Sequence, residues 1–187
     1  MAILILAEHH VGGITQGTLA SVTAAKQINK DIDLFLIGNH LDAALEQARK
    51  VEGLRNVLVT DQASYQHLLA ENVAPLLVSL SKNYSHLIAA SSTFTKNVLP
   101  RVAAILDVMM LSDVTEVISS DTFVRPIYAG NAFATYQSTD NFKVISIRAT
   151  AFDKACFGEA QAPVQAFEQE FRDPRVVFLK NECPVLE

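Results

Sequence analysis

The chain has 187 residues, of which 50% are hydrophobic and 19% charged, a composition and length typical of a globular protein with its own core. Fifteen Lys and Arg against twenty Asp and Glu give a net charge of −5, and no segment gathers a run of basic residues. This balance argues against nucleic acid or an anionic membrane as a partner. No apolar run reaches the roughly 20 residues of a membrane-spanning helix, so we expect no membrane insertion.

The cysteines and the start of the chain predict a cytoplasmic protein. Cys156 and Cys183 lie far apart and form no CxxC pair, which favours reduced thiols over a disulfide framework. The first residues show no basic region before a long apolar stretch and no small-residue cleavage site. We therefore expect neither a signal peptide nor a transit peptide.

The first half of the chain predicts alternating strands and helices. Near-continuous apolar runs, typical of parallel strands buried on both faces, occur at residues 2–7, 32–37, 57–59 and 87–90. Stretches with helical spacing lie between them, at residues 17–28, 41–51 and 73–80. This order predicts an α/β fold with a mainly parallel sheet and helices on both faces.

Residues that start or end helices refine this prediction. Asp42 is expected to cap the start of the second helix, and Gly53 to end it in a left-handed conformation. Asn72 is expected to cap the third helix, whose first turn then accommodates Pro75.

A fourth helix is expected at residues 99–106, after a loop at residues 91–97. Its start is open between two interpretations. If Asn97 is the cap, Pro100 fits the first turn, whereas a start near Thr93 places Pro100 inside the helix and kinks it.

The pattern changes after Asp107. Period-two stretches joined by turn-forming sequences predict an antiparallel hairpin region, with strands at residues 114–119, 122–128, 132–137 and 143–148. A loop with a weak helix is expected at residues 160–171 and a short strand at 175–179. The whole chain, residues 1–187, is interpreted as a single domain.

The sequence presents no catalytic or metal-binding constellation. His9 and His10 are adjacent after the first strand, so their side chains point in different directions and do not form an i, i+4 ligand pair. The other three histidines are isolated in sequence. We therefore predict no catalytic residue, no metal site and no enzyme activity.

Two loops could hold an anion, and each has a plainer interpretation. Gly12 and Gly13 follow the first strand, where α/β folds often bind phosphate, but no GxGxxG or GxxxxGK[ST] motif confirms this, so a flexible loop is the alternative. Residues 91–96 offer hydroxyl groups, amides and Lys96. They could equally cap a helix, which needs no ligand.

A third segment, residues 125–131, combines arginine and tyrosine with a tight turn. Arginine and tyrosine are enriched in contact surfaces, whereas Gly and Asn are expected in any hairpin turn. The alternatives of a partner contact and an ordinary hairpin with an edge proline stay open. The candidate partner-interface residues are Arg125, Pro126, Tyr128 and Asn131.

Several of these segments together resemble the alpha subunit of electron-transfer flavoprotein. The resemblance lies in residues 3–8, 94–108, 112–114 and 125–132, in this order, and extends from residue 1 to about residue 152. Thr95 stands where the family's Phe-Gly-Lys-Asn pattern would have glycine. This departure speaks against a ligand role for that loop.

The resemblance implies a part of a larger electron carrier. Such an alpha subunit pairs with a beta subunit, and the heterodimer carries electrons on FAD from acyl-CoA dehydrogenases and other flavoprotein dehydrogenases to a membrane quinone oxidoreductase. Most FAD contacts in the family come from a carboxy-terminal domain, which we expect to be absent from this chain. No FAD-binding residue is therefore expected here.

The resemblance also implies a role for the chain itself. The family's amino-terminal domain is Rossmann-like, similar to adenine-nucleotide-alpha-hydrolase domains, and acts as a scaffold and as the contact with the beta subunit. The alternative is a free-standing adenine-nucleotide-binding module with AMP or ATP at the carboxyl ends of its strands. A hydrolase is disfavoured because the sequence shows no triad-like arrangement.

Overall fold

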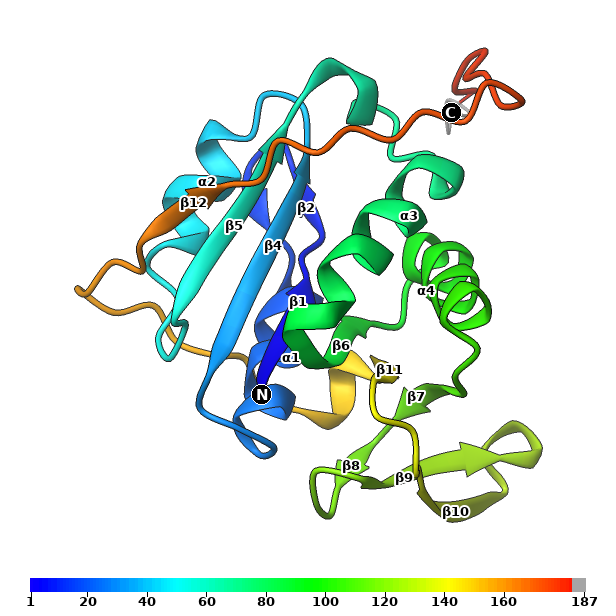
Figure 1. Cartoon of the computed structure of the whole chain (residues 1–187). Helices are drawn as coiled ribbons and strands as arrows, with labels where there is room; N and C mark the ends of the chain where they lie inside the picture. Colours follow the sequence, from blue (N-terminus) through cyan, green and yellow to red (C-terminus); the bar gives the residue numbers. More distant parts are fainter. Residues whose placement is uncertain (183–187) are drawn as a thin grey trace, which may run out of the picture.

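The apolar runs of the first half form the centre of the main sheet in the computed structural model, which describes residues 1–182. They become β1 (Ala2–Leu6), β4 (Ile32–Gly38), β5 (Asn56–Asp61) and β6 (Tyr84–Ala90). The sheet is completed by β7 (Met110–Val114), β11 (Lys143–Ile147) and β12 (Val164–Ala166). Its order is β12-β5-β4-β1-β6-β11-β7, and each neighbouring pair is parallel (Figure 1).

Helices cover both faces of this sheet, as predicted. Alternate side chains of β1 enter two separate hydrophobic clusters, because successive residues of a strand point to opposite faces. One cluster contains residues of α1 (Gln16–Lys26) and α2 (Asp42–Ala48), and the other residues of α3 (Ala70–Leu80) and α4 (Thr93–Leu106). The α/β fold class is confirmed.

Short elements connect these layers. A two-stranded ribbon, β2 (His9–His10) and β3 (Gly13–Ile14), follows β1. A separate three-stranded antiparallel sheet contains β8 (Glu116–Val117), β9 (Thr122–Ile127) and β10 (Ala132–Gln137). The 3-10 helices are η1 (Ala63–Tyr65), η2 (Ser81–Asn83), η3 (Tyr128–Gly130) and η4 (Ala149–Ala151).

The hairpin region is smaller than the sequence predicted. The run 143–148 was expected to be antiparallel, but β11 lies in the main sheet between β6 and β7. Its last four residues are all buried, as in a parallel strand covered on both faces. The run 114–119 is also divided, because β7 ends at Val114 and β8 begins at Glu116.

Three predicted helix caps are displaced. α3 begins at Ala70 with Leu69 as its N-cap, so Asn72 lies inside the helix, where its buried Oδ1 accepts the Asp173 amide (2.9 Å). Pro75 consequently lies mid-helix. Asp42 is the first residue of α2 and not its cap. Gly53 is left-handed as predicted (φ 85°), although it lies in a turn beyond the end of α2.

α4 begins at Thr93, so most of the predicted loop 91–97 is helical and the start at Asn97 is wrong. Ser92 and Thr95 form a capping box, in which each side chain bonds the other residue's backbone amide. The helix is thus capped at Ser92, five residues before Asn97, and Pro100 lies in the helix interior.

The last described segment forms a strand where a weak helix was expected. β12 pairs with β5 and covers that edge of the sheet, and the chain then runs across the molecule (Figure 1). Residues 175–179, expected as a strand, form none. Side chains of Gln62, Tyr65 and Asn72 bond the backbone of this segment. Nothing in the sequence of residues 160–171 indicated this strand, because its hydrogen-bonding partner β5 lies about a hundred residues earlier in the chain.

Cys156 is exposed and free, and Cys183 lies outside the described residues.

Candidate partner-binding site

The three-stranded sheet stands beside β7, the edge strand of the main sheet, and projects from it (Figure 1). β9 and β10 pair from Thr122↔Gln137 to Ile127↔Ala132. Residues opposite one another share a face, so one face carries Phe123, Arg125, Ile127, Ala132, Ala134 and Tyr136, and the other carries Thr122, Val124, Pro126, Phe133, Thr135 and Gln137.

The first of these faces is turned towards the protein. Phe123 is 1% exposed and belongs to the core cluster, against which Val117 and Tyr136 also pack. We call this the inner face. Apolar burial at Phe123 therefore ties the small sheet to the main core.

Arg125 also points inward. Its Nε donates to the Ser112 carbonyl (2.7 Å) and its Nη2 to the Ser112 hydroxyl (2.8 Å). The guanidinium lies 5.9 Å from the centre of the Tyr136 ring. Because Ser112 belongs to β7, these contacts join the hairpin to the edge of the main sheet.

Hydrogen bonds of His86 and Asp121 hold the end of the small sheet that lies away from the Tyr128 tip. His86 Nε2 lies 2.7 Å from the Ser120 carbonyl, which can only accept, so this nitrogen carries the proton. Burial lowers the pKa of His86, which keeps the ring neutral near pH 7. The Asp121 carboxylate accepts from Ser119, Gln137 and Thr122, and these hydrogen bonds lower its pKa.

On the other face of the β9–β10 hairpin, the residues of β10 and the tip are exposed, whereas Pro126 of β9 is buried. Phe133 is 65% exposed and Tyr128, at the tip, is 80% exposed. Tyr128, Ala129 and Gly130 are all left-handed, with φ of 48°, 55° and 92°. Each non-glycine residue in this conformation costs about 1–2 kcal/mol. Such strain clusters at functional sites, and here it lies at an exposed aromatic residue.

The four candidate interface residues thus lie in different environments. Tyr128 and Asn131 are exposed at the tip, whereas Pro126 is buried and Arg125 is half-buried and bonded to Ser112. The exposed residues Phe133 and Thr135 were not among the candidates. The period-two pattern of residues 132–137 could have identified them, because it places Phe133 and Thr135 on the face opposite Tyr136.

The loop at Gly12 and Gly13 is closed by Gln47. Its Nε2 donates to the Gly12 carbonyl (2.9 Å), and its Oε1 accepts the Ile14 amide (3.2 Å). A Cβ on Gly13 would lie 2.0 Å from Gln47 Oε1. The side chain of Gln47 therefore occupies the place where a phosphate would approach the backbone.

The second candidate anion loop is a helix cap. Thr95 is fully buried, and its Oγ1 donates to the Ala90 carbonyl while accepting the Ser92 amide. Glu8 lies at the end of β1, next to β6, where the strand order reverses. Burial raises the pKa of its carboxyl, and its amide donates to Thr18 Oγ1 (2.9 Å). The Glu8 amide and the Thr95 hydroxyl are therefore both bonded within the protein.

A pocket of about 440 Å³ opens where β1 and β4 end, lined in part by His9, His10 and His40. His9 Nε2 contacts the Ile37 carbonyl (2.9 Å), and His10 Nδ1 accepts the Gly12 amide (2.9 Å). Within residues 1–182, no three or more His, Cys, Asp or Glu side chains are grouped so that they could hold a metal ion.

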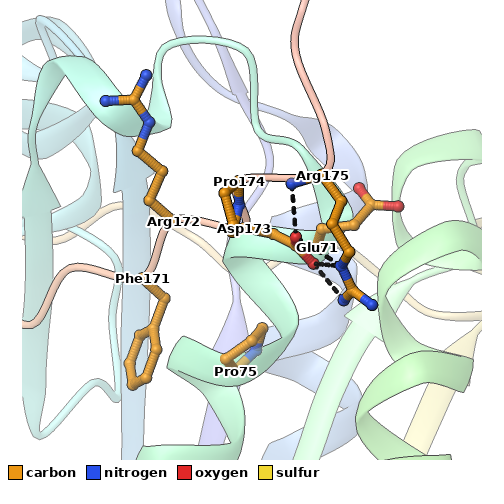
Figure 2. A pocket seen from close by; sticks show the side chains of 7 residues that line it. All are labelled: Glu71, Pro75, Phe171, Arg172, Asp173, Pro174 and Arg175. Atoms are coloured by element: carbon orange, nitrogen blue, oxygen red, sulfur yellow. Dashed lines mark hydrogen bonds and ion pairs between the residues drawn. The ribbon is translucent and has the colours of Figure 1, made fainter.

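Figure 2 shows a second pocket, of about 320 Å³, between α3 and the last described segment. Pro75 and Phe171 form its apolar side. Its charges are largely paired, since Asp173 bonds Arg175 (2.6 Å) and Glu71 bonds Arg101 (2.8 Å). Because these charged side chains already have partners within the protein, we interpret the pocket as a packing contact between α3 and the last described segment, and not as a ligand site.

Comparison with known proteins decides the family. Residues 3–171 match the electron transfer flavoprotein domain. The chain belongs to the electron transfer flavoprotein family. It is 52% identical to the electron transfer flavoprotein subunit alpha of Pseudomonas aeruginosa, over 88% of this chain and 53% of that protein.

Two further members of this family extend the comparison. The alpha subunit of Paracoccus denitrificans is 46% identical, over 88% of this chain and 53% of that protein. The mitochondrial alpha subunit of Dictyostelium discoideum is 41% identical, over 81% of this chain and 45% of that protein. The chain thus spans about half the length of the curated relatives it matches. Among the described residues, no helix combines the length and apolar character needed to cross a membrane.

Proposed function

We propose that this chain is the amino-terminal domain of an electron transfer flavoprotein alpha subunit and that it serves as scaffold and as contact for the beta subunit. The hairpin of β9 and β10 supports this contact role, because its inner face is anchored to the core while Tyr128 and Phe133 are exposed to solvent. Exposed aromatic side chains on a rigid support are typical anchors of protein interfaces.

The wider role follows from the family. The complete heterodimer would carry electrons on FAD from flavoprotein dehydrogenases, such as acyl-CoA dehydrogenases, to a quinone oxidoreductase, and would act as a carrier and not as an enzyme. A cytoplasmic location stays a prediction, because one relative is named mitochondrial.

FAD does not fit the strand-end region of this chain. A dinucleotide requires free backbone amides for its diphosphate, usually in a glycine-rich turn after a strand. Here Gln47 occupies the Gly12–Gly13 turn and the capping box uses the amides of Ser92 and Thr95. We therefore assign no FAD contact to these residues. The same observations disfavour a free-standing AMP or ATP module.

Calorimetric titration with the beta subunit from the same organism tests the contact role. We expect the wild-type chain to bind, and Tyr128→Ala and Phe133→Ala to weaken binding roughly 10- to 100-fold, as for central aromatic residues of an interface. Phe157→Ala is the matched control, because Phe157 is 50% exposed on a segment that pairs with Val51, away from the hairpin.

Each outcome has a defined meaning. Loss of affinity in the two hairpin variants, with Phe157→Ala within about twofold of wild type, supports the hairpin as the contact. Equal affinity in all three variants rejects it. Titrations with FAD and with AMP alone complete the set, and tight AMP binding without the beta subunit would favour the nucleotide module.

A further inference from the structure

We infer that Arg125 is a positioning residue of the proposed interface: it bonds the hairpin to Ser112 of β7 and so holds Tyr128 and Phe133 in one orientation. This inference rests on the proposed function, because the orientation matters only if the hairpin binds a partner. Arg125 thus has a different role from Tyr128 and Asn131, the exposed residues that were predicted with it as interface residues.

Two residues hold the outer half of the hairpin: Pro126 is buried, and Arg125 makes the only side-chain hydrogen bonds that join described residues 125–134 to the rest of the protein. β8 pairs with β9 only at Phe123 and Val124. Beyond these residues the β9–β10 ladder is two-stranded, and isolated two-stranded hairpins are marginally stable in water. Phe123 is the apolar anchor at the near end, and Arg125 lies two residues closer to the tip on the same face.

The geometry explains why an arginine stands at this position. Its planar guanidinium donates from two nitrogens to two oxygens of one residue, the Ser112 carbonyl and hydroxyl. The ammonium of a lysine cannot reproduce this fork. Ala134 lies directly across from Arg125, and its small side chain leaves room for the guanidinium beside Tyr136.

The expected consequence is preorganisation. A hairpin that moves freely must be ordered when it binds, and this ordering reduces affinity even where no contact is lost. Removing the Arg125 fork should therefore weaken beta-subunit binding through the orientation of Tyr128 and Phe133. Arg125 itself would contribute no contact to the partner.

A double-mutant cycle separates positioning from direct contact. We expect Arg125→Ala to weaken beta-subunit binding about fivefold in the wild-type chain, and less than about twofold when Tyr128 and Phe133 are already alanine. If Arg125 contacts the partner itself, it weakens binding by the same factor in both backgrounds. That additive result would overturn the inference.

Hydrogen exchange of the free chain gives a readout that does not depend on the partner. We expect Arg125→Ala to speed amide exchange in residues 127–133 about tenfold, without a change in the strands of the main sheet. Arg125→Lys should not restore protection, because it lacks the fork. Ser112→Ala should have a smaller effect, since it removes the hydroxyl but keeps the carbonyl, and Ser112→Thr should retain protection.

The two readouts distinguish failure of the inference from failure of the proposed function. If exchange in residues 127–133 rises but no hairpin variant changes beta-subunit affinity, Arg125 does position the hairpin and the proposed contact fails. If Tyr128→Ala weakens binding while Arg125→Ala leaves exchange unchanged, the contact stands and the inference is wrong.

Discussion

The seven-stranded sheet is covered by helices on both faces, whereas the three-stranded sheet packs one face on the protein and leaves much of the other exposed, along β10 and the tip. In the large sheet, nearly every apolar side chain contributes to stability by being buried. In the small sheet, exposed Tyr128 and Phe133 contribute little to folding. The difference indicates which aromatic residues belong to the fold and which are free for a partner.

Truncating one phenylalanine in each sheet tests this difference directly. Phe35 is fully buried in β4 and packs edge-on against Phe167 (5.9 Å), so Phe35→Ala should reduce the free energy of unfolding by about 3–5 kcal/mol. Phe133→Ala removes the same atoms from an exposed site and should change it by less than about 0.5 kcal/mol. Urea unfolding followed by circular dichroism measures both values.

A milder variant keeps this test informative if Phe35→Ala does not fold. Ile37→Val removes one methyl group from the same strand and should cost about 0.5–1.5 kcal/mol. A loss from Phe133→Ala as large as that from Ile37→Val would show that the hairpin's outer face also supports the fold.

Sequence patterns predicted the centre of the large sheet and the β9–β10 hairpin, but not the strands that extend the large sheet at its edges. Continuous apolar runs identified β1, β4, β5 and β6, because strands buried on both faces leave a local signal. The position of β11 and the pairing of β12 with β5 were missed, since partners distant in sequence decide them. Pro100 obscured the start of α4, although the Ser92–Thr95 capping box was visible in the sequence.

The candidate site was predicted in part for the same reason. Residue types and turn signals pointed to the hairpin and its exposed tip, which are local features. The inward direction of Arg125 depends on Ser112, thirteen residues earlier, and on the register between β9 and β10. Composition alone cannot distinguish an arginine that contacts a partner from one that supports the hairpin.

A buried charge in the large sheet provides the next test. Asp33 of β4 accepts hydrogen bonds from Arg55, from Asn56 of the neighbouring strand β5 and from Tyr84 of β6, which lies two strands away. Burial alone raises the pKa of Asp33, but these bonds outweigh it and lower the pKa below the usual 3.8. Asp33→Asn should therefore reduce the free energy of unfolding by about 2 kcal/mol at neutral pH.

The pH dependence of this effect has a defined sign. Since the pKa is lower in the folded chain, the unfolded chain takes up the proton first as pH falls. The Asp33 contribution is complete above pH 4 to 5, roughly, and is lost as pH falls through the folded-state pKa. The difference between wild type and Asp33→Asn should thus shrink in acid. Asp153→Asn, at an exposed position, is the control, and a difference that grows in acid would contradict the assignment.

The smallest expected effect concerns the strained tip of the small sheet. Ala129 is left-handed (φ 55°), so Ala129→Gly should relieve strain and stabilise the hairpin by about 0.5 kcal/mol, after the entropic cost of glycine. Ala104→Gly, at an exposed position inside α4, should instead destabilise the chain by about 1 kcal/mol. Local hydrogen exchange measures the first change and urea unfolding the second.

If Ala129→Gly slows exchange and also weakens beta-subunit binding, the strained turn is retained because it orients Tyr128. If affinity is unchanged, the tip conformation serves only to close the hairpin, and the contact depends on side chains alone.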